Sequence, residues 1–136
     1  MGNENEILHE QITLLERLSN ACGVSGDEAE VRAIVLEQLK PVADEIKVDA
    51  LGNVLVTRKA KVEKPLRVMM AAHMDEVGFM LVDSEEGGFF RFETIGGPDG
   101  RVLPGKAVLI GRDHIPGVIG TKPIFLNGTQ GMPAVY

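Results

Sequence analysis

The sequence is poor in aromatic residues and in positive charge. Its 136 residues contain no Trp and one Tyr, and aromatic residues make up 4%. A stacking platform for single-stranded nucleic acid is therefore not expected. Acidic residues outnumber basic residues by 20 to 14, and a net charge of −6 would repel a phosphate backbone. The sequence predicts no nucleic-acid partner.

Cysteine and long apolar runs are scarce as well. The single cysteine, Cys22, cannot form an internal disulfide, and we expect it to be a small buried residue at a helix end. A reducing cytoplasm fits this cysteine usage. The N-terminus lacks the apolar core of a signal peptide, and no run approaches the length of a membrane span. We therefore expect a cytoplasmic protein without a membrane partner.

Two amphipathic helices are predicted in the first part of the chain. Apolar residues recur at spacings of three and four within residues 5–21, and again within residues 31–39. Ser25 and Glu28 have the spacing of a capping box, which would begin the second helix. Lys40-Pro41 would end it.

The hydrophobic period then changes to that of strands. Apolar and polar residues alternate within residues 45–50 and 54–58, on either side of a turn, and this pattern predicts a hairpin. Residues 66–72 form a nearly unbroken apolar run, which is typical of a central strand buried on both faces. After Glu76 the chain predicts strands and no long helix, because Gly and Pro punctuate short apolar runs. These later strands are expected at residues 77–82, 88–94, 107–110 and 117–119, and residues 126–136 are expected to be an irregular tail.

The triplet His73-Met74-Asp75 directly follows the predicted central strand. Binding sites in open α/β sheets form at that edge. A histidine there can ligate a metal through one ring nitrogen while a nearby carboxylate holds the ring. Taken alone, the triplet also fits a hydrogen-bonded histidine without a metal. We expect His9 to be a solvated helix residue and His114 a loop residue.

Six ordered segments carry a resemblance to a known family. The longest is V-M-M-A-A-H-M-D-E-V-G-F-M at residues 68–80. The sequence resembles the cytosolic dinuclear metallo-aminopeptidases, which include glutamyl aminopeptidases and tetrahedral aminopeptidases. The other matching segments are residues 23–28, 49–53, 95–97, 101–105 and 117–123.

The resemblance implies an α/β fold class in two parts. Residues 1–76 would be the first part of a metallopeptidase catalytic α/β domain, with two helices and a mixed sheet. Residues 77–136 would be a β-rich, barrel-like dimerisation domain, possessing all or part of the inserted domain of the family. The resemblance also implies a homo-oligomer, and an exposed apolar edge at residues 66–72 would favour association for a physical reason.

The resemblance further implies a chemistry. His73 would bind one metal of a pair, and Asp75 would serve catalysis by orienting the His73 imidazole, whereas Glu76 would be structural. The metal would be zinc, cobalt or manganese, among which the sequence does not choose. The reaction of the full-length enzyme would be hydrolysis of the N-terminal residue of a peptide substrate, with a metal-activated water. The sequence does not indicate which N-terminal residue is cleaved.

The chain departs from the family in its set of ligands. The resemblance implies that the other metal ligands and the general-base glutamate of the family lie downstream of the matching segments. A catalytic zinc generally needs three protein ligands, so we expect weak or absent metal binding and no activity from this chain alone. Three alternatives stay open: a non-enzymatic assembly module, the remnant of a split gene, and a subunit that completes a site with a partner chain. An Asp-x-Gly segment and a Glu-Glu pair in the reading frame beyond Tyr136 would indicate a truncated enzyme.

Overall fold

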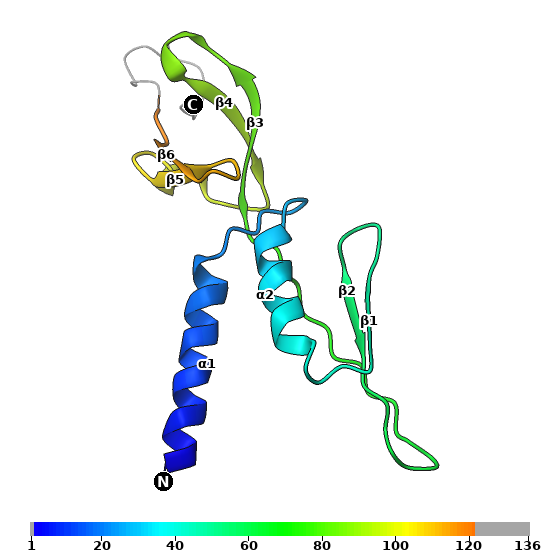
Figure 1. The fold of residues 1–136 in the computed structure, drawn as a ribbon. Coiled ribbons are helices and arrows are strands. Elements are labelled where there is room, and N and C mark those ends of the chain that lie inside the picture. The colour runs from blue at the N-terminus through cyan, green and yellow to red at the C-terminus, as the bar shows by residue number, and fades with distance from the viewer. Residues whose placement is uncertain (1, 122–136) are drawn as a thin grey trace. The chain divides into compact units, whose positions relative to one another are not determined.

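The structure is a computed structural model that describes residues 2–121, with side chains from Ile7 onward. The chain divides by its internal contacts into two units, Met1–Glu76 and Val77–Tyr136. Figure 1 shows the helices at the start of the chain and the hairpins that follow them. No helix within the described residues is long and apolar enough to cross a membrane.

The first unit contains both predicted helices, α1 (Gly2–Asn20) and α2 (Ala29–Leu39), which confirms that prediction. Arg17 joins them through a two-pronged ion pair to Glu37, with N–O distances of 2.6 and 2.9 Å. Hydrogen bonding within the pair lowers the pKa of Glu37 and raises that of Arg17. Both side chains are exposed, so the pair contributes little to stability.

The predicted capping box at the start of α2 is wrong. The N-cap residue of α2 is Glu28, and it makes no side-chain cap hydrogen bond. The Glu28 carboxylate instead accepts the Gly26 amide at 2.6 Å. The Ser25 hydroxyl donates to Asp75 at 2.5 Å. Because each side chain has another partner, neither is available to the helix end in the way the local pattern predicted.

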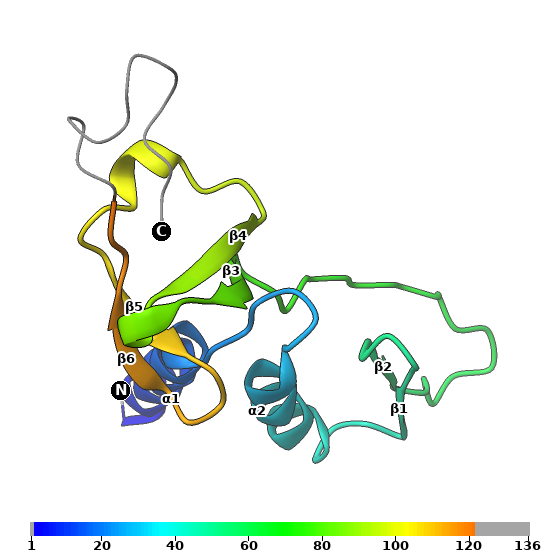
Figure 2. The same ribbon diagram turned by 90° about the horizontal axis from the view of Figure 1, so that it is seen from above.

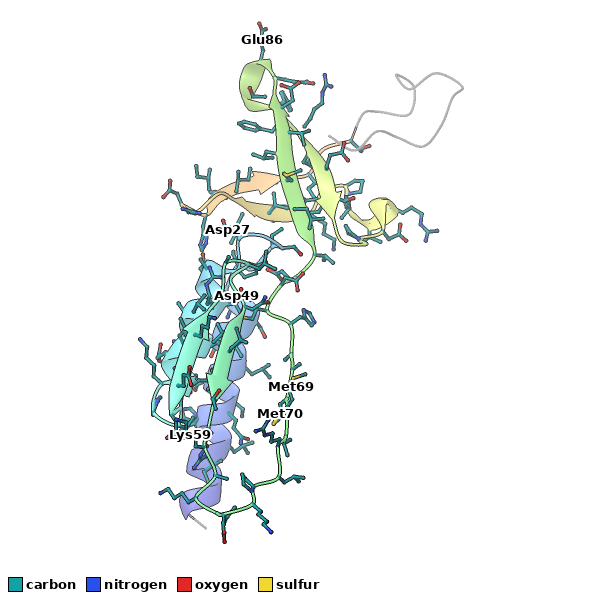
Figure 3. All side chains as sticks on the ribbon, turned by 90° about the vertical axis from the view of Figure 1, so that its right-hand side faces the viewer. Asp27, Asp49, Lys59, Met69, Met70 and Glu86 are labelled. Atoms are coloured by element: carbon teal, nitrogen blue, oxygen red, sulfur yellow. The ribbon has the colours of Figure 1, made fainter. Side chains whose placement is uncertain are left out.

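The predicted hairpin is confirmed as β1 (Glu45–Val48) paired antiparallel with β2 (Val54–Thr57). Asp49, labelled in Figure 3, closes its turn. The Asp49 carboxylate accepts the Leu51 amide and both the backbone and side-chain amides of Asn53, each at 2.9 Å. These hydrogen bonds, that of the Asn53 side chain above all, lower the pKa of Asp49. A carboxylate that satisfies three amides explains why this short turn forms.

The predicted central strand at residues 66–72 is wrong. The structure assigns no strand there, and Figure 2 shows the stretch as a trace without an arrow. Leu66, Val68, Met69 and Met70 are 87%, 74%, 89% and 92% exposed, and the two methionines are labelled on an extended run in Figure 3. A strand needs a neighbour for its backbone N–H and C=O groups, and no described strand pairs with this run.

The expected mixed sheet of the first unit is wrong for the same reason. Its sheet within the described residues is the two-stranded antiparallel pair β1–β2. The hairpin packs on α2, which contacts β2. A mixed sheet would require the run at residues 66–72 to pair in parallel with a further strand, and that pairing is not made.

The second unit consists of two hairpins within its described residues. β3 (Gly78–Ser84) pairs antiparallel with β4 (Phe90–Ile95), and the short 3₁₀ turn η1 (Glu86–Gly88) joins them. Figure 3 labels Glu86 at this turn. β5 (Ala107–Ile110) pairs antiparallel with β6 (Ile115–Val118). All four strands were predicted from the sequence to within a few residues.

The second unit holds the buried large apolar side chains of the described residues. Leu103, just after the 3₁₀ turn η2 (Gly100–Val102), is 7% exposed, and Ile119 is 4% exposed. The Ile119 carbonyl accepts the Gly105 amide at 2.8 Å, which ties the end of β6 to this turn. Leu103 and Ile119 therefore mark the centre of a small core.

The predicted barrel-like arrangement is wrong for residues 77–121. The pairs β3–β4 and β5–β6 are separate two-stranded sheets. A barrel requires hydrogen bonding to continue from strand to strand until the sheet closes. The coarser prediction, a small α/β chain with two helices followed by β-rich sequence, is confirmed. The predicted irregular tail at residues 126–136 lies outside the described residues.

Candidate metal-ligand site at His73

Two backbone segments that are far apart in sequence join beside the candidate site. Val24 and Glu76 form a parallel bridge, and the Glu76 amide donates to the Gly23 carbonyl at 2.7 Å. The Gly23 amide donates in turn to the Glu76 carboxylate at 3.3 Å. A Cβ on Gly23 would lie 2.8 Å from Val31 Cγ2 and 3.1 Å from the Met74 carbonyl oxygen. Glycine therefore permits the close approach that brings residues 23–26 beside residues 74–76.

His73 lies next to this join, the backbone contact between residues 23–26 and residues 74–76. Its imidazole is 85% exposed. Its Nδ1 atom lies 2.8 Å from the Asp75 backbone oxygen and 3.1 Å from Asp75 Oδ1. A carbonyl and an ionised carboxylate only accept hydrogen bonds, so the neutral ring carries its proton on Nδ1. The lone pair on Nε2 is then the one available to a metal ion.

The Asp75 carboxylate contacts two side chains at once. Oδ1 faces His73, and Oδ2 accepts the Ser25 hydroxyl at 2.5 Å. The Ser25 hydrogen bond, followed by that of His73, holds the pKa of Asp75 below its ordinary range. Asp75 is therefore ionised at neutral pH, as a partner of an imidazole ligand should be.

Sequence reasoning missed Ser25 at this site. The local pattern assigned Ser25 to a helix cap, although it lies 50 positions from Asp75 in the chain. Its one available signal was its place in the matching segment at residues 23–28. A contact of that sequence separation is visible only after the chain has folded.

The structure also places Cys22, His9 and His114, the other residues weighed in the sequence analysis. Cys22 is half-buried just past the end of α1, near the expected place though less buried than expected. Burial, and then the Glu30 and Glu76 carboxylates, raise the pKa of its thiol. His9 is exposed on α1, and His114 stands in the turn between β5 and β6 with φ at 51°.

The residues around His73 fit one ligand of a transition-metal site and not a whole one. The exposed imidazole with an engaged Nδ1 is the usual form of a histidine ligand. A catalytic metal site generally takes three protein ligands, and both Asp75 oxygens are already engaged. No catalytic step through a metal can therefore be assigned to these residues alone.

The fold and this site define an α/β protein that carries a candidate metal-ligating histidine. The family described as M42 glutamyl aminopeptidase matches residues 52–134, well over half of the chain. The chain belongs to this family.

Individual relatives agree with the family match. The chain is 36% identical over 117 residues to the lysyl aminopeptidase of Pyrococcus furiosus, covering 84% of this chain and 33% of the relative. It is 34% identical over 126 residues to the glutamyl aminopeptidase of Lactococcus lactis, covering 89% and 35%. Among solved structures, the Pyrococcus horikoshii TET1 peptidase, which can assemble into a tetrahedron or a large octahedral shell, superposes with a TM-score of 0.70 at 31% identity. That match covers 92% of this chain and 37% of the TET1 chain.

The relatives are much longer than this chain. The chain spans about a quarter to a third of the length of the curated relatives it matches. What a full-length relative does is therefore a hypothesis for this chain.

Proposed function

We propose that this chain provides the N-terminal part of a metal-dependent aminopeptidase that hydrolyses N-terminal residues of peptides. In this proposal His73 is one metal ligand through Nε2, and Asp75 orients its ring. The contact between His73 Nδ1 and Asp75 Oδ1 is the observation that carries the proposal. A bound divalent metal pair, of zinc, cobalt or manganese, would supply an activated water and polarise the scissile carbonyl.

The chain alone is proposed to be inactive. The described surroundings of His73 offer one ligand, and the chain spans about a third of the length of its aminopeptidase relatives. Further ligands and a general base would come from polypeptide beyond the matched region. The alternative is a non-enzymatic assembly module, which the many exposed apolar side chains of the first unit favour.

The two units receive different roles in this proposal. Residues 1–76 belong to a catalytic α/β domain, and residues 77–136 belong to an inserted domain for dimerisation. A homo-oligomer is supported by the assembling TET1 relative. A cytoplasmic location is supported by the single cysteine.

A zinc titration tests the assignment of His73. Wild type should bind zinc weakly through His73, so His73→Ala should abolish this binding. His9→Ala removes an exposed histidine of the same unit and should bind as wild type does. Isothermal titration calorimetry on the three proteins provides the measurement. Equal affinity in wild type and His73→Ala would contradict the assignment.

A separate assay tests the proposal that the chain alone has no aminopeptidase activity. The isolated chain should not hydrolyse Glu-, Asp-, Leu- or Lys-anilides with added zinc, cobalt or manganese. Loss of one general acid or base typically costs about 10² to 10⁴ in rate, and several groups are lacking here. Turnover that disappears in His73→Ala would overturn this expectation, because it would show that an assembly of the chain completes a site.

A further inference from the structure

Hydrogen bonds connect three side chains in series, from the loop before α2 to the candidate metal ligand. The Ser25 hydroxyl donates to Asp75 Oδ2 at 2.5 Å, and Asp75 Oδ1 accepts from His73 Nδ1 at 3.1 Å. The two carboxylate oxygens thus face two different partners. Ser25 is the only one of the three whose role is not explained by the proposed metal site.

The backbone around Ser25 is built to hold this contact. The parallel bridge between Val24 and Glu76 immediately precedes Ser25 on one side and follows Asp75 on the other. The Glu76 amide also donates a hydrogen bond to the Gly23 carbonyl at 2.7 Å. Ser25 itself is exposed and makes no cap for α2, so its hydroxyl has no part in the helix end.

We propose that Ser25 is a positioning residue for the His73 imidazole. Its hydroxyl fixes the rotation of the Asp75 carboxylate so that the other oxygen faces Nδ1, which keeps the proton on Nδ1 and the lone pair on Nε2. This inference rests on the proposed function, in which Nε2 binds the metal. It adds Ser25, which lies in the loop before α2, to the residues that orient the His73 ring.

Loss of the hydroxyl should weaken the arrangement without abolishing it. An exposed carboxylate that has lost its hydroxyl partner can rotate away from Nδ1. The Asp75 backbone oxygen, at 2.8 Å, would still accept from Nδ1. Ser25→Ala should therefore shift the population from the Nδ1–H tautomer toward the Nε2–H tautomer and weaken zinc binding about tenfold, the low end of the range for outer partners of metal ligands.

The tautomer of His73 can be measured without any metal. The probe is the pair of ring ¹⁵N chemical shifts in ¹⁵N-histidine-labelled chain, at a pH of about 8, where an ordinary histidine is neutral. Ser25→Thr keeps a hydroxyl and should restore the wild-type shifts. Ser19→Ala removes an exposed serine hydroxyl from α1 and should change neither nitrogen of His73. Backbone amide spectra of each variant establish that it folds as wild type does.

The two readouts separate this inference from the proposed function. Unchanged His73 ring shifts in a folded Ser25→Ala chain would overturn the positioning role of Ser25, whatever the chain does with zinc. Shifts that move in Ser25→Ala and return in Ser25→Thr support it. If those shifts move but zinc leaves them untouched in wild type, Ser25 positions the ring and the metal assignment alone fails.

Discussion

At the scale of single residues, Gly23 decides whether the candidate site can form. A Cβ there would lie 2.8 Å from Val31 Cγ2 and 3.1 Å from a backbone oxygen of Met74. The backbone oxygen cannot move aside as a flexible side chain could. The join between residues 23–26 and residues 74–76 thus depends on the absence of a side chain.

Gly23→Ala should therefore destabilise the first unit. Overpacking of this kind typically costs about 1–3 kcal/mol. The measurement is urea unfolding followed by circular dichroism. Gly97→Ala is the matched control, since a Cβ on Gly97 would meet no atom within 4 Å and should leave the midpoint unchanged. A Gly23→Ala midpoint equal to wild type would mean that the join opens in solution.

The sequence predicted the contact between His73 and Asp75 but not the contact between Ser25 and Asp75. His73 and Asp75 are two positions apart, so their contact follows from the chain itself. Ser25 has a pattern that fits a helix cap, but its partner lies 50 positions away. Local hydrogen-bonding preferences of serine do not distinguish these two uses, because both satisfy the same hydroxyl.

At the scale of elements, the helices and hairpins that form their hydrogen bonds within a short stretch of chain were predictable from the sequence. The state of the run at residues 66–72 was not. Helices α1 and α2 and the hairpins β1–β2, β3–β4 and β5–β6 complete their backbone hydrogen bonds among neighbours in sequence. The hydrophobic periodicity of each segment was therefore sufficient to predict these elements. The run at residues 66–72 has equally strong apolar character, but a central strand depends on partners elsewhere in the polypeptide.

Amide hydrogen exchange tests the state of that run. Amides of residues 67–71 should exchange at nearly unprotected rates, because no backbone partner is described for them. Amides that pair β3 with β4 should exchange more slowly and serve as the internal reference. Protection at residues 67–71 equal to that of β3–β4 would show that the run pairs with something in solution, such as a second copy.

At the scale of the whole molecule, much apolar surface faces solvent. Leu103 and Ile119 are the buried large apolar side chains of the described residues. Exposed ones occur in both units, and two groups of them lie on α1 and along residues 66–70. Those on α1 are Ile7, Leu8, Ile12 and Leu15. Surface of this kind is characteristic of proteins that bind another chain.

The chain should accordingly form a dimer or larger assembly whose mass rises with concentration. Met70→Glu places a charge on the exposed run and should lower the mass at a given concentration. Leu51→Glu makes the same change at a turn residue that is 85% exposed, and should have less effect. Multi-angle light scattering gives the measurement. A monomer at high concentration in wild type would contradict the expectation.

The exposure of residues 66–70 also has a consequence for oxidation. Met69 and Met70 are 89% and 92% exposed, whereas Met74 is half-buried. Peroxide converts an accessible thioether to a polar sulfoxide, which is a poor residue for an apolar strand. Because both thioethers face solvent, an oxidant would make the exposed run polar at these two sulfur atoms. Methionine sulfoxide reductases would reverse this change and restore the two apolar side chains.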